Sequence, residues 1–167
     1  VMNGNSAILA IQLGEKLLSQ RQTVTCAESC TGGGVASAIT DVPGSSQWFH
    51  AGFVTYANQS KQQLLGVPAE VLLSEGAVSK SVVELMALGA LKSSDADVAV
   101  AVSGVAGPGG GTKEKPVGLV WFCWAKRSGG DVSVMEAQSF QFKGERSTVR
   151  AAAIEQALKG LIHILEK

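Results

Sequence analysis

The sequence predicts an α/β fold, a three-layer α/β/α sandwich with a mixed central sheet. Helical and strand patterns alternate through the first half of the chain, which is typical of parallel strands joined by helices. Two strand patterns then follow each other across "KRSGGD", which indicates a hairpin and hence antiparallel strands. A nearly continuous apolar run at 97–104 suits a central strand that is covered on both faces.

The first half of the chain contains three helical and two strand patterns. Ser6 is a candidate N-cap for the first helix. The third helix should end at Gly66, because Pro68 disfavours helical conformation at Val67. In order, we expect a helix at 6–20, a strand at 23–27, a helix at 33–42, a turn at 43–46, a strand at 51–57 and a helix from about Ser60.

The second half combines the longest amphipathic helix with three strands. The segment "GVAGPGGGTKEKP" cannot form regular structure. We find no internal repeat and no linker, so the prediction is a single domain over 1–167. The expected elements are a helix at 78–94, strands at 97–104, 117–125 and 132–142, and a final helix at 145–166.

Composition limits the possible partners. Hydrophobic residues make up 46% of the 167 residues, enough for a sizeable core in one domain. Fourteen basic and fourteen acidic residues cancel, so nothing predicts a nucleic-acid partner. No leader and no apolar run of about 20 residues is present, and we expect a cytoplasmic protein without a membrane partner.

The cysteines and histidines do not predict a metal site. Cys26, Cys30 and Cys123 lack CxxC spacing, and the chain has only two histidines. We expect the thiols to be small buried hydrophobic groups in a reducing compartment. The sequence therefore predicts no metal and no cofactor.

The stretch "TCAESCTGGGVAS" places Ser29 where a strand pattern changes to a helix. Unpaired amides at a helix start point outward, and the helix dipole adds positive potential there. Gly32, Gly33 and the glycine after them leave the backbone near Thr31 open, so this turn can cradle an oxyanion or a phosphate. The alternative is structural: Ser29 or Thr31 caps the helix, and the glycines permit tight packing.

A nucleophilic serine needs a base, and histidine is its usual partner. His163 lies in the last helix pattern, where a packing or surface role is expected, and His50 stays an alternative. Lys61 is the better candidate, since the start of a short helix and partial burial both favour its neutral form. A neutral amine can take the Ser29 proton, as in serine–lysine hydrolases. A merely solvated lysine is the competing interpretation.

A second glycine cluster follows the predicted central strand. It lacks the GK[ST] order of a Walker A loop and the strand-to-helix context of a GxGxxG motif. Its position is nevertheless where α/β sheets bind ligands. We expect donors from Ser103 and from the cluster that includes Gly107, Gly109 and Gly110. A mobile surface hairpin is the alternative.

Arg146 and Arg150 lie four residues apart at the start of the last helix, so they share one face. Both charges oppose the helix dipole, and an anionic ligand would offset this cost. A phosphate suits the planar guanidinium group. A solvated face is equally compatible with the pattern.

Taken together, these motifs resemble the carboxy-terminal domain family of the competence/damage-inducible protein CinA, and more closely its stand-alone form, the nicotinamide-nucleotide amidases. The resemblance runs from about residue 6 to 165. The motifs that carry it are "AESCTGG" (27–33), "GFVTYANQSKQQLLGV" (52–67), "GAVS" (76–79), "SGVAGPGGGTKEKPVG" (103–118) and "GERSTVR" (144–150).

The resemblance implies hydrolysis of the carboxamide of nicotinamide mononucleotide to nicotinate mononucleotide and ammonia, in pyridine-nucleotide recycling. It further implies a metal-free serine–lysine mechanism and a homo-oligomer. By motif, Ser29 becomes the nucleophile, Lys61 the base and later the acid, and Tyr56 a residue that orients the lysine or the reacting groups. Arg146 and the glycine loop would bind the ribose phosphate. Glu145 stands where the family is expected to have the aspartate of a "GDR" triplet.

Two other functions fit the same residues. A non-catalytic nucleotide-binding or regulatory module of the CinA family would keep the pocket and bind the mononucleotide without turnover. A thiol enzyme would use Cys30 beside Ser29, although the two side chains should point in different directions at a helix start.

Overall fold

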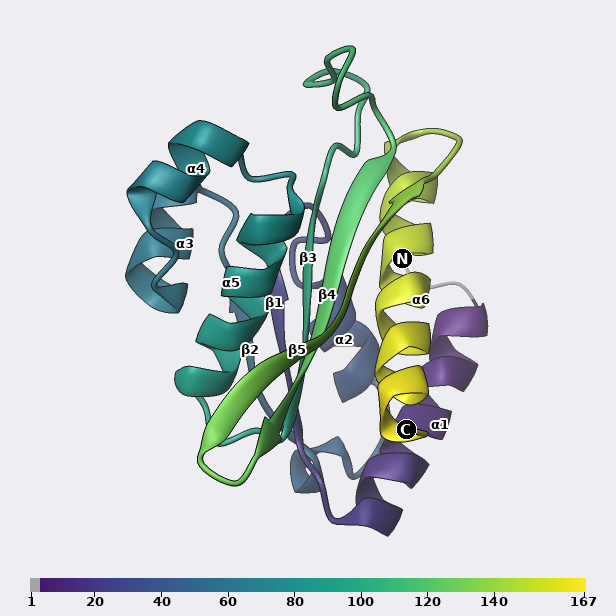
Figure 1. The fold of residues 1–167 in the computed structure, drawn as a ribbon. Coiled ribbons are helices and arrows are strands. Elements are labelled where there is room, and N and C mark those ends of the chain that lie inside the picture. Colours follow the sequence, from purple (N-terminus) through teal and green to yellow (C-terminus); the bar gives the residue numbers. More distant parts are fainter. Residues whose placement is uncertain (1–3) are drawn as a thin grey trace.

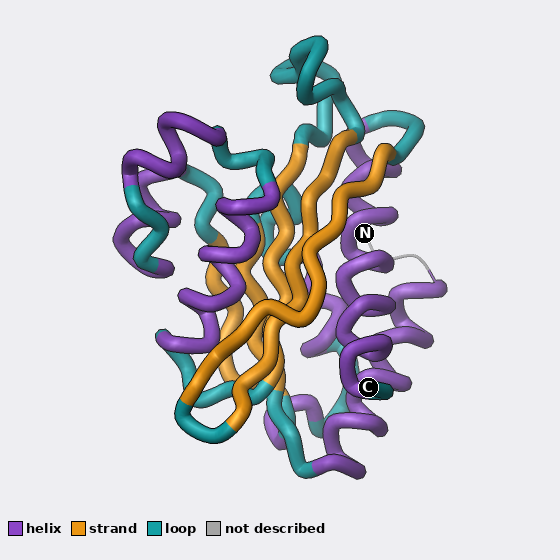
Figure 2. Tube along the Cα trace, viewed as in Figure 1, coloured by secondary structure: helices purple, strands orange, loops and turns teal. Residues whose placement is uncertain are grey.

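The computed structural model of the chain describes residues 4–167, so the first three residues of the predicted domain lie outside the described part. Figures 1 and 2 show a twisted sheet with helices on both sides. Along the chain the elements are α1 (Gly4–Gln20), β1 (Val24–Glu28), α2 (Gly34–Thr40), a short 3-10 helix η1 (Ser45–Gln47), β2 (Phe49–Val54), α3 (Asn58–Leu65), α4 (Ala69–Glu75), α5 (Lys80–Lys92), β3 (Val98–Gly104), β4 (Leu119–Ser128), β5 (Asp131–Gln141) and α6 (Arg146–Leu165).

The five strands form one mixed sheet in the order β2-β1-β3-β4-β5. β1 pairs in parallel with β2 and β3, whereas β3, β4 and β5 pair in antiparallel fashion. Helices α1, α2 and α6 lie on one side of this sheet, and α3, α4 and α5 on the other (Figure 1). The predicted three-layer α/β/α sandwich with a mixed sheet is therefore confirmed.

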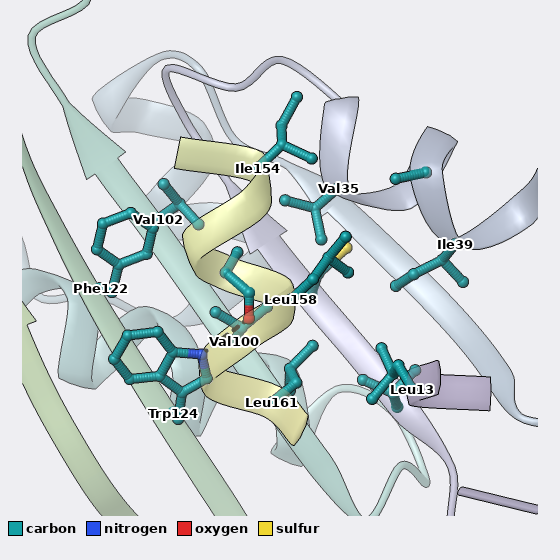
Figure 3. Close-up of a cluster of buried hydrophobic side chains, with 14 of the residues drawn as sticks. Leu13, Val35, Ile39, Val100, Val102, Phe122, Trp124, Ile154, Leu158 and Leu161 are labelled. Atoms are coloured by element: carbon teal, nitrogen blue, oxygen red, sulfur yellow. Dashed lines mark hydrogen bonds between the residues drawn. The ribbon is translucent and has the colours of Figure 1, made fainter. Parts of the chain in front are cut away.

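Two hydrophobic cores fill the space between the layers. The first lies under α1, α2 and α6, where α6 crosses the sheet with Leu158 and Leu161 against Val100 (Figure 3). Trp124 belongs to this core, and its indole N–H donates to the carbonyl of Ala157 at 3.0 Å, so the buried polar group is satisfied. The second core lies under α5, where the sheet presents mainly small side chains. β3 is buried along all but its last residue, as predicted for a central strand.

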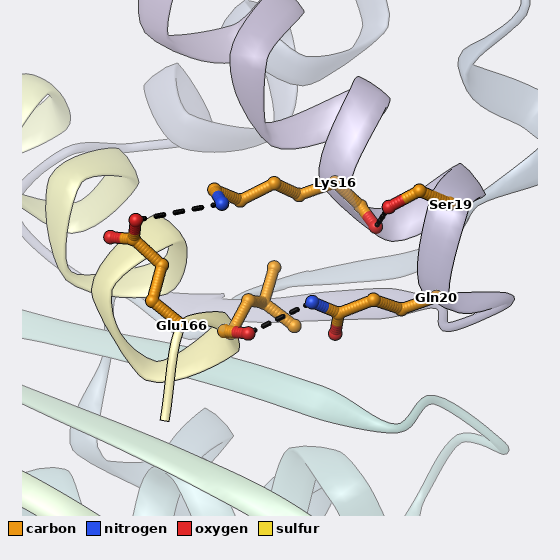
Figure 4. Close-up of polar contacts among 5 residues, drawn as sticks. Lys16, Ser19, Gln20 and Glu166 are labelled. Atoms are coloured by element: carbon orange, nitrogen blue, oxygen red, sulfur yellow. Dashed lines mark hydrogen bonds and ion pairs between the residues drawn. The ribbon is translucent and has the colours of Figure 1, made fainter.

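Polar contacts join α1, the first helix of the chain, to α6, the last one (Figure 4). Gln20 donates to the carbonyl of Leu165 at 2.9 Å, and Lys16 pairs with Glu166 at 3.5 Å. The ion pair is exposed, so it contributes at most about 1 kcal/mol. Apolar packing in the first core is what fixes the two helices together.

Some predicted boundaries were wrong. α1 begins at Gly4, so Ser6 is a buried residue inside the helix and not its N-cap. β2 spans Phe49–Val54 and begins two residues before the predicted strand. α4 was not predicted, although Pro68 at its start is a common signal for a helix N-terminus. The hairpin across Gly129 and the end of the third helix at Gly66 are confirmed.

Within residues 4–167, every helix falls short of the length or the apolar character that a bilayer crossing requires.

Candidate active site

Ser29 lies at the carboxyl end of β1, in the turn that leads to α2. Its backbone N–H donates to the carbonyl of Val102 on β3 at 2.9 Å, which continues the parallel ladder one residue beyond Glu28. Ser29 is half-buried. The strand thus delivers the hydroxyl to the edge of the sheet where α/β proteins bind their ligands.

Lys61 reaches the same place from α3. Its side chain is fully buried, and Nζ lies 3.1 Å from the Oγ of Ser29. The amine also contacts the carbonyls of Thr55 at 2.7 Å and Tyr56 at 3.2 Å, both in the segment between β2 and α3. The structure therefore brings together the serine and the lysine that the sequence singled out.

Burial lowers the pKa of Lys61, because desolvation penalises the ammonium form; a smaller electrostatic effect of Cys30 acts in the opposite direction. A neutral amine has two N–H donors and one lone pair. The two carbonyls accept both donors, which leaves the lone pair for the Ser29 hydroxyl to donate to. The same three contacts also satisfy an ammonium, so proton transfer requires no rearrangement.

Glu28 is the site residue that the sequence analysis missed. Its carboxylate is fully buried and accepts hydrogen bonds from the Thr31 hydroxyl at 2.6 Å and from the amides of Val35 at 2.9 Å and Ala36 at 3.0 Å. It therefore takes the place of a helix cap for α2, whose N-cap residue Gly33 provides no side chain. The only sequence signal was its position directly before Ser29.

This arrangement limits which amides can meet a ligand. Glu28 occupies the first free amides of α2, so a helix-end anion site is not left open there. Within residues 4–167 the amides of Cys30 and Thr31 have no backbone acceptor, whereas Gly32 donates to the Ser29 carbonyl. The candidate oxyanion donors are thus the two amides that directly follow the serine.

The predicted glycines of this turn serve its backbone conformation. Gly32 has φ 58° and Gly33 has φ 99°, in the left-handed region that other residues rarely adopt. A Cβ on Gly32 would face Arg150, and a Cβ on Gly33 would face Val54. Neither glycine lines the cleft at the serine, and Thr31 is buried with its hydroxyl turned to Glu28.

The two arginines of α6 have different partners. Arg150 donates from Nε to the Cys30 carbonyl and from Nη2 to the Thr31 carbonyl, each at 3.1 Å. It therefore fixes the backbone of the turn that follows Ser29. Arg146 donates from Nη1 to the Gly107 carbonyl at 2.8 Å and from Nη2 to the Tyr56 hydroxyl at 3.0 Å. Only Arg146 lines the cleft that contains the serine.

This cleft has a volume of 310 Å³ and lies between the serine turn and the glycine-rich loop. Gly107, Gly109 and Gly110 line it as predicted, but Ser103 is buried within β3 and does not. The residues that line it are Ser29, Cys30, Tyr56, Val78, Gly104, Val105, Ala106, Gly107, Gly109, Gly110 and Arg146. A larger cavity of 570 Å³ lies between α2 and α6 and excludes the serine, so size alone would misplace the site.

The glycine-rich loop projects beyond the end of the sheet, at the top of Figure 1. It is attached on both sides of the cleft. Lys115 donates to the carbonyl of Glu75 at the end of α4, and Arg146 binds the Gly107 carbonyl from α6. These contacts argue against the alternative of an unattached surface hairpin.

The competing nucleophile and bases are less suited to the chemistry. Burial raises the pKa of the Cys30 thiol to about 11, so this group is protonated near neutral pH and is a poor nucleophile. His50 lies exposed on the edge strand β2, and His163 lies exposed on α6. Within residues 4–167, no cluster of metal-binding side chains is present.

Comparison with known proteins identifies the family of the chain. A family model described as the CinA C-terminal domain matches residues 6–165. The chain is 52% identical to nicotinamide-nucleotide amidohydrolase PncC of Escherichia coli, covering 92% of this chain and 90% of that protein. It is 53% identical to the PncC of Pseudomonas putida, covering 93% and 94%. The crystal structure of the competence/damage inducible protein CihA from Agrobacterium tumefaciens has a TM-score of 0.93 at 41% identity, covering 100% and 99%.

Proposed function

This chain belongs to the CinA C-terminal domain family, and on that basis we propose that it hydrolyses the carboxamide of nicotinamide mononucleotide to nicotinate mononucleotide and ammonia. Relatives that match nearly the whole chain carry the name nicotinamide-nucleotide amidohydrolase. The observation that carries the proposal is the 3.1 Å contact between Lys61 Nζ and Ser29 Oγ in a desolvated site. A role in the recycling of pyridine nucleotides follows from this reaction.

In the acylation step, neutral Lys61 takes the proton of Ser29 while Oγ attacks the carboxamide carbon. Negative charge then develops on the former carbonyl oxygen, and the amides of Cys30 and Thr31 are the donors nearest in sequence to the nucleophile. The Lys61 ammonium returns its proton to the nitrogen, and ammonia leaves. The acyl-enzyme keeps the pyridine carbonyl on Ser29.

In the second step, water takes the position that ammonia left. Lys61, neutral again, accepts a proton from this water as the water oxygen attacks the acyl carbon. The bond to Ser29 then breaks, and the serine regains its proton from Lys61. The products are nicotinate mononucleotide and free enzyme. No metal ion is needed for this sequence of proton transfers.

Arg146 is the group that we assign to the phosphate of the substrate. Its guanidinium is exposed, lines the cleft and is held near the mouth by Gly107 and Tyr56. Arginine suits phosphate through its planar set of donors. Tyr56 is 59% exposed and also gives its carbonyl to Lys61, so it links the phosphate end of the cleft to the base.

The test is ammonia release from nicotinamide mononucleotide, with product identified by chromatography. The wild-type protein should release ammonia and nicotinate mononucleotide in equal amounts, with or without a chelator. Ser29→Ala should fold normally and lose turnover by several orders of magnitude. If the wild-type protein binds the mononucleotide but releases no ammonia, the non-catalytic nucleotide-binding module is the correct interpretation.

A further inference from the structure

Thr55 carries a buried hydroxyl that no group in the protein satisfies. The residue is fully buried, and its Oγ1 is one of two buried side-chain polar atoms within residues 4–167 that have no hydrogen-bond partner; the other belongs to Gln22. An unpaired buried hydroxyl lowers stability, and natural proteins retain few of them. Valine has nearly the same shape without this cost. The position of Thr55 therefore calls for a functional explanation.

The sheet register places Thr55 directly beside the nucleophile. β1 and β2 pair in parallel with Glu28 opposite Val54, and the Thr55 amide donates to the Glu28 carbonyl at 2.9 Å. The next residues along the two strands are Ser29 and Thr55. Neighbouring strands lie about 4.8 Å apart, so these two residues are adjacent across the sheet.

Both side chains point to the same face of the sheet. Successive side chains on a strand alternate between faces. Ala27 belongs to the core under α5, and its partner Phe53 packs against that same core, so the residues two positions on face the same way. Lys61 enters from α3, which lies on this side of the sheet (Figure 1). Ser29, Thr55 and Lys61 therefore meet on one face.

The backbone of Thr55 already contacts the base, because its carbonyl accepts from Lys61 Nζ at 2.7 Å. When Lys61 takes the serine proton, a positive charge forms in a site that excludes water. The two carbonyls and the Ser29 oxygen already accept from all three N–H groups of the ammonium, so the Thr55 hydroxyl acts through its dipole. Because it has no fixed partner, it can turn its hydrogen away from the charge, and in a desolvated site such a dipole is more effective than in water.

We propose that Thr55 is a positioning residue for Lys61, and that its hydroxyl stabilises the ammonium which forms when the Ser29 proton is transferred. The inference rests on the serine–lysine assignment of the proposed function. It goes beyond that assignment because it explains why the chain keeps an unsatisfied polar group beside the base.

The experiment measures the reactivity of Ser29 without using the substrate. A fluorophosphonate probe phosphonylates an activated serine: the Oγ–P bond forms, the P–F bond breaks, fluoride leaves and the hydroxyl proton passes to Lys61. The labelling rate, followed by intact mass, therefore reports on the step that creates the ammonium. Unfolding in urea is measured on the same samples.

Thr55→Val should label about 10- to 100-fold more slowly, the order of loss expected when a polar group that stabilises a buried charge is removed. Its unfolding midpoint should stay the same or rise, because an unpaired hydroxyl is removed. Thr55→Ser keeps the hydroxyl and should restore most of the labelling rate.

Thr25→Val is the matched control. Thr25 is also fully buried in the parallel part of the sheet, but its hydroxyl donates to the Ala51 carbonyl at 2.6 Å. This variant should lose stability and keep its labelling rate, which is the reverse of the pattern expected for Thr55→Val.

Three results would overturn the inference: wild-type labelling by Thr55→Val, equal losses in the valine and serine variants, or a fall in the unfolding midpoint of Thr55→Val that matches its kinetic loss. A wild-type protein that labels at Ser29 but leaves nicotinamide mononucleotide intact would refute the proposed function alone. A wild-type protein that does not label would refute both.

Discussion

Replacing Glu28 tests whether the serine turn depends on one buried carboxylate. Glu28→Ala removes the hydrogen bonds that the carboxylate accepts from the Thr31 hydroxyl, the Cys26 thiol and the amides of Val35 and Ala36, and leaves most of these donors buried. Loss of a helix cap alone costs about 0.5–2 kcal/mol, and each unsatisfied buried group adds about 1–3 kcal/mol. The lower limits of these values already sum to more than about 3 kcal/mol, so we expect the free energy of unfolding to fall by at least about 3 kcal/mol.

Glu28→Gln gives a finer test of the same contacts. The amide has nearly the same shape as the carboxylate but offers one acceptor oxygen, so its NH2 group faces an amide donor whichever way it is turned. We expect a loss of about 1–3 kcal/mol and a lower kcat, because the turn that carries Ser29 is no longer fixed at both oxygens.

Urea unfolding and steady-state ammonia release measure the two effects. Glu84→Gln is the control, since Glu84 makes a partly exposed ion pair with Lys80 on α5 and the substitution should change stability by less than about 1 kcal/mol. If Glu28→Ala unfolds at the same urea concentration as the wild-type protein, the carboxylate does not hold the turn, and our account of α2 capping is wrong.

Other substitutions separate the base, the phosphate contact and the packing beneath the base. Since burial lowers the pKa of Lys61, kcat/KM should rise with pH through an inflection below the ordinary lysine pKa of about 10.4; an inflection at the ordinary value contradicts this. The buried amine should lower the free energy of unfolding below its folded-state pKa, and this loss should disappear as pH rises from that pKa to the ordinary value. Arg146→Ala should raise KM for the mononucleotide and leave the weak reaction of the unphosphorylated riboside unchanged; equal effects on both would refute the phosphate contact. Gly89→Ala would drive a Cβ into the Leu65 carbonyl, displace α3 and lower stability by about 1–3 kcal/mol, whereas Gly130→Ala meets nothing and serves as the control in urea unfolding and turnover.

Sequence reasoning singled out the two residues of the proposed catalytic pair because each of them has a local signal. Ser29 stands between a β-branched strand and a glycine triplet, and Lys61 stands in the first helical turn after another strand. In a parallel sheet both strands end at the same edge, so the two side chains converge without further information. The fold class followed from the same patterns.

The supporting residues could not be found in this way, because their partners are far apart in the sequence. Arg150 holds carbonyls that lie 119 and 120 residues earlier, and nothing near it distinguishes it from Arg146. Glu28 binds amides seven and eight residues later through a turn whose shape depends on positive φ angles. Ser103 was expected in the cleft, but strand alternation turns its side chain to the face of the sheet that α5 covers, where it is buried.

The contact between Ser29 and Lys61 depends on a single extra residue in β2. Val24 pairs with Phe49 and Thr25 with Ala51, so His50 has no partner and the register shifts by one position there. Because side chains alternate with a period of two, a strand without this shift would turn its later residues to the opposite face. Thr55 would then face α2, and the segment that presents Lys61 would leave the sheet on the wrong side of Ser29. An irregularity at the amino end of an edge strand thus determines on which face of the sheet Ser29 and Lys61 can meet.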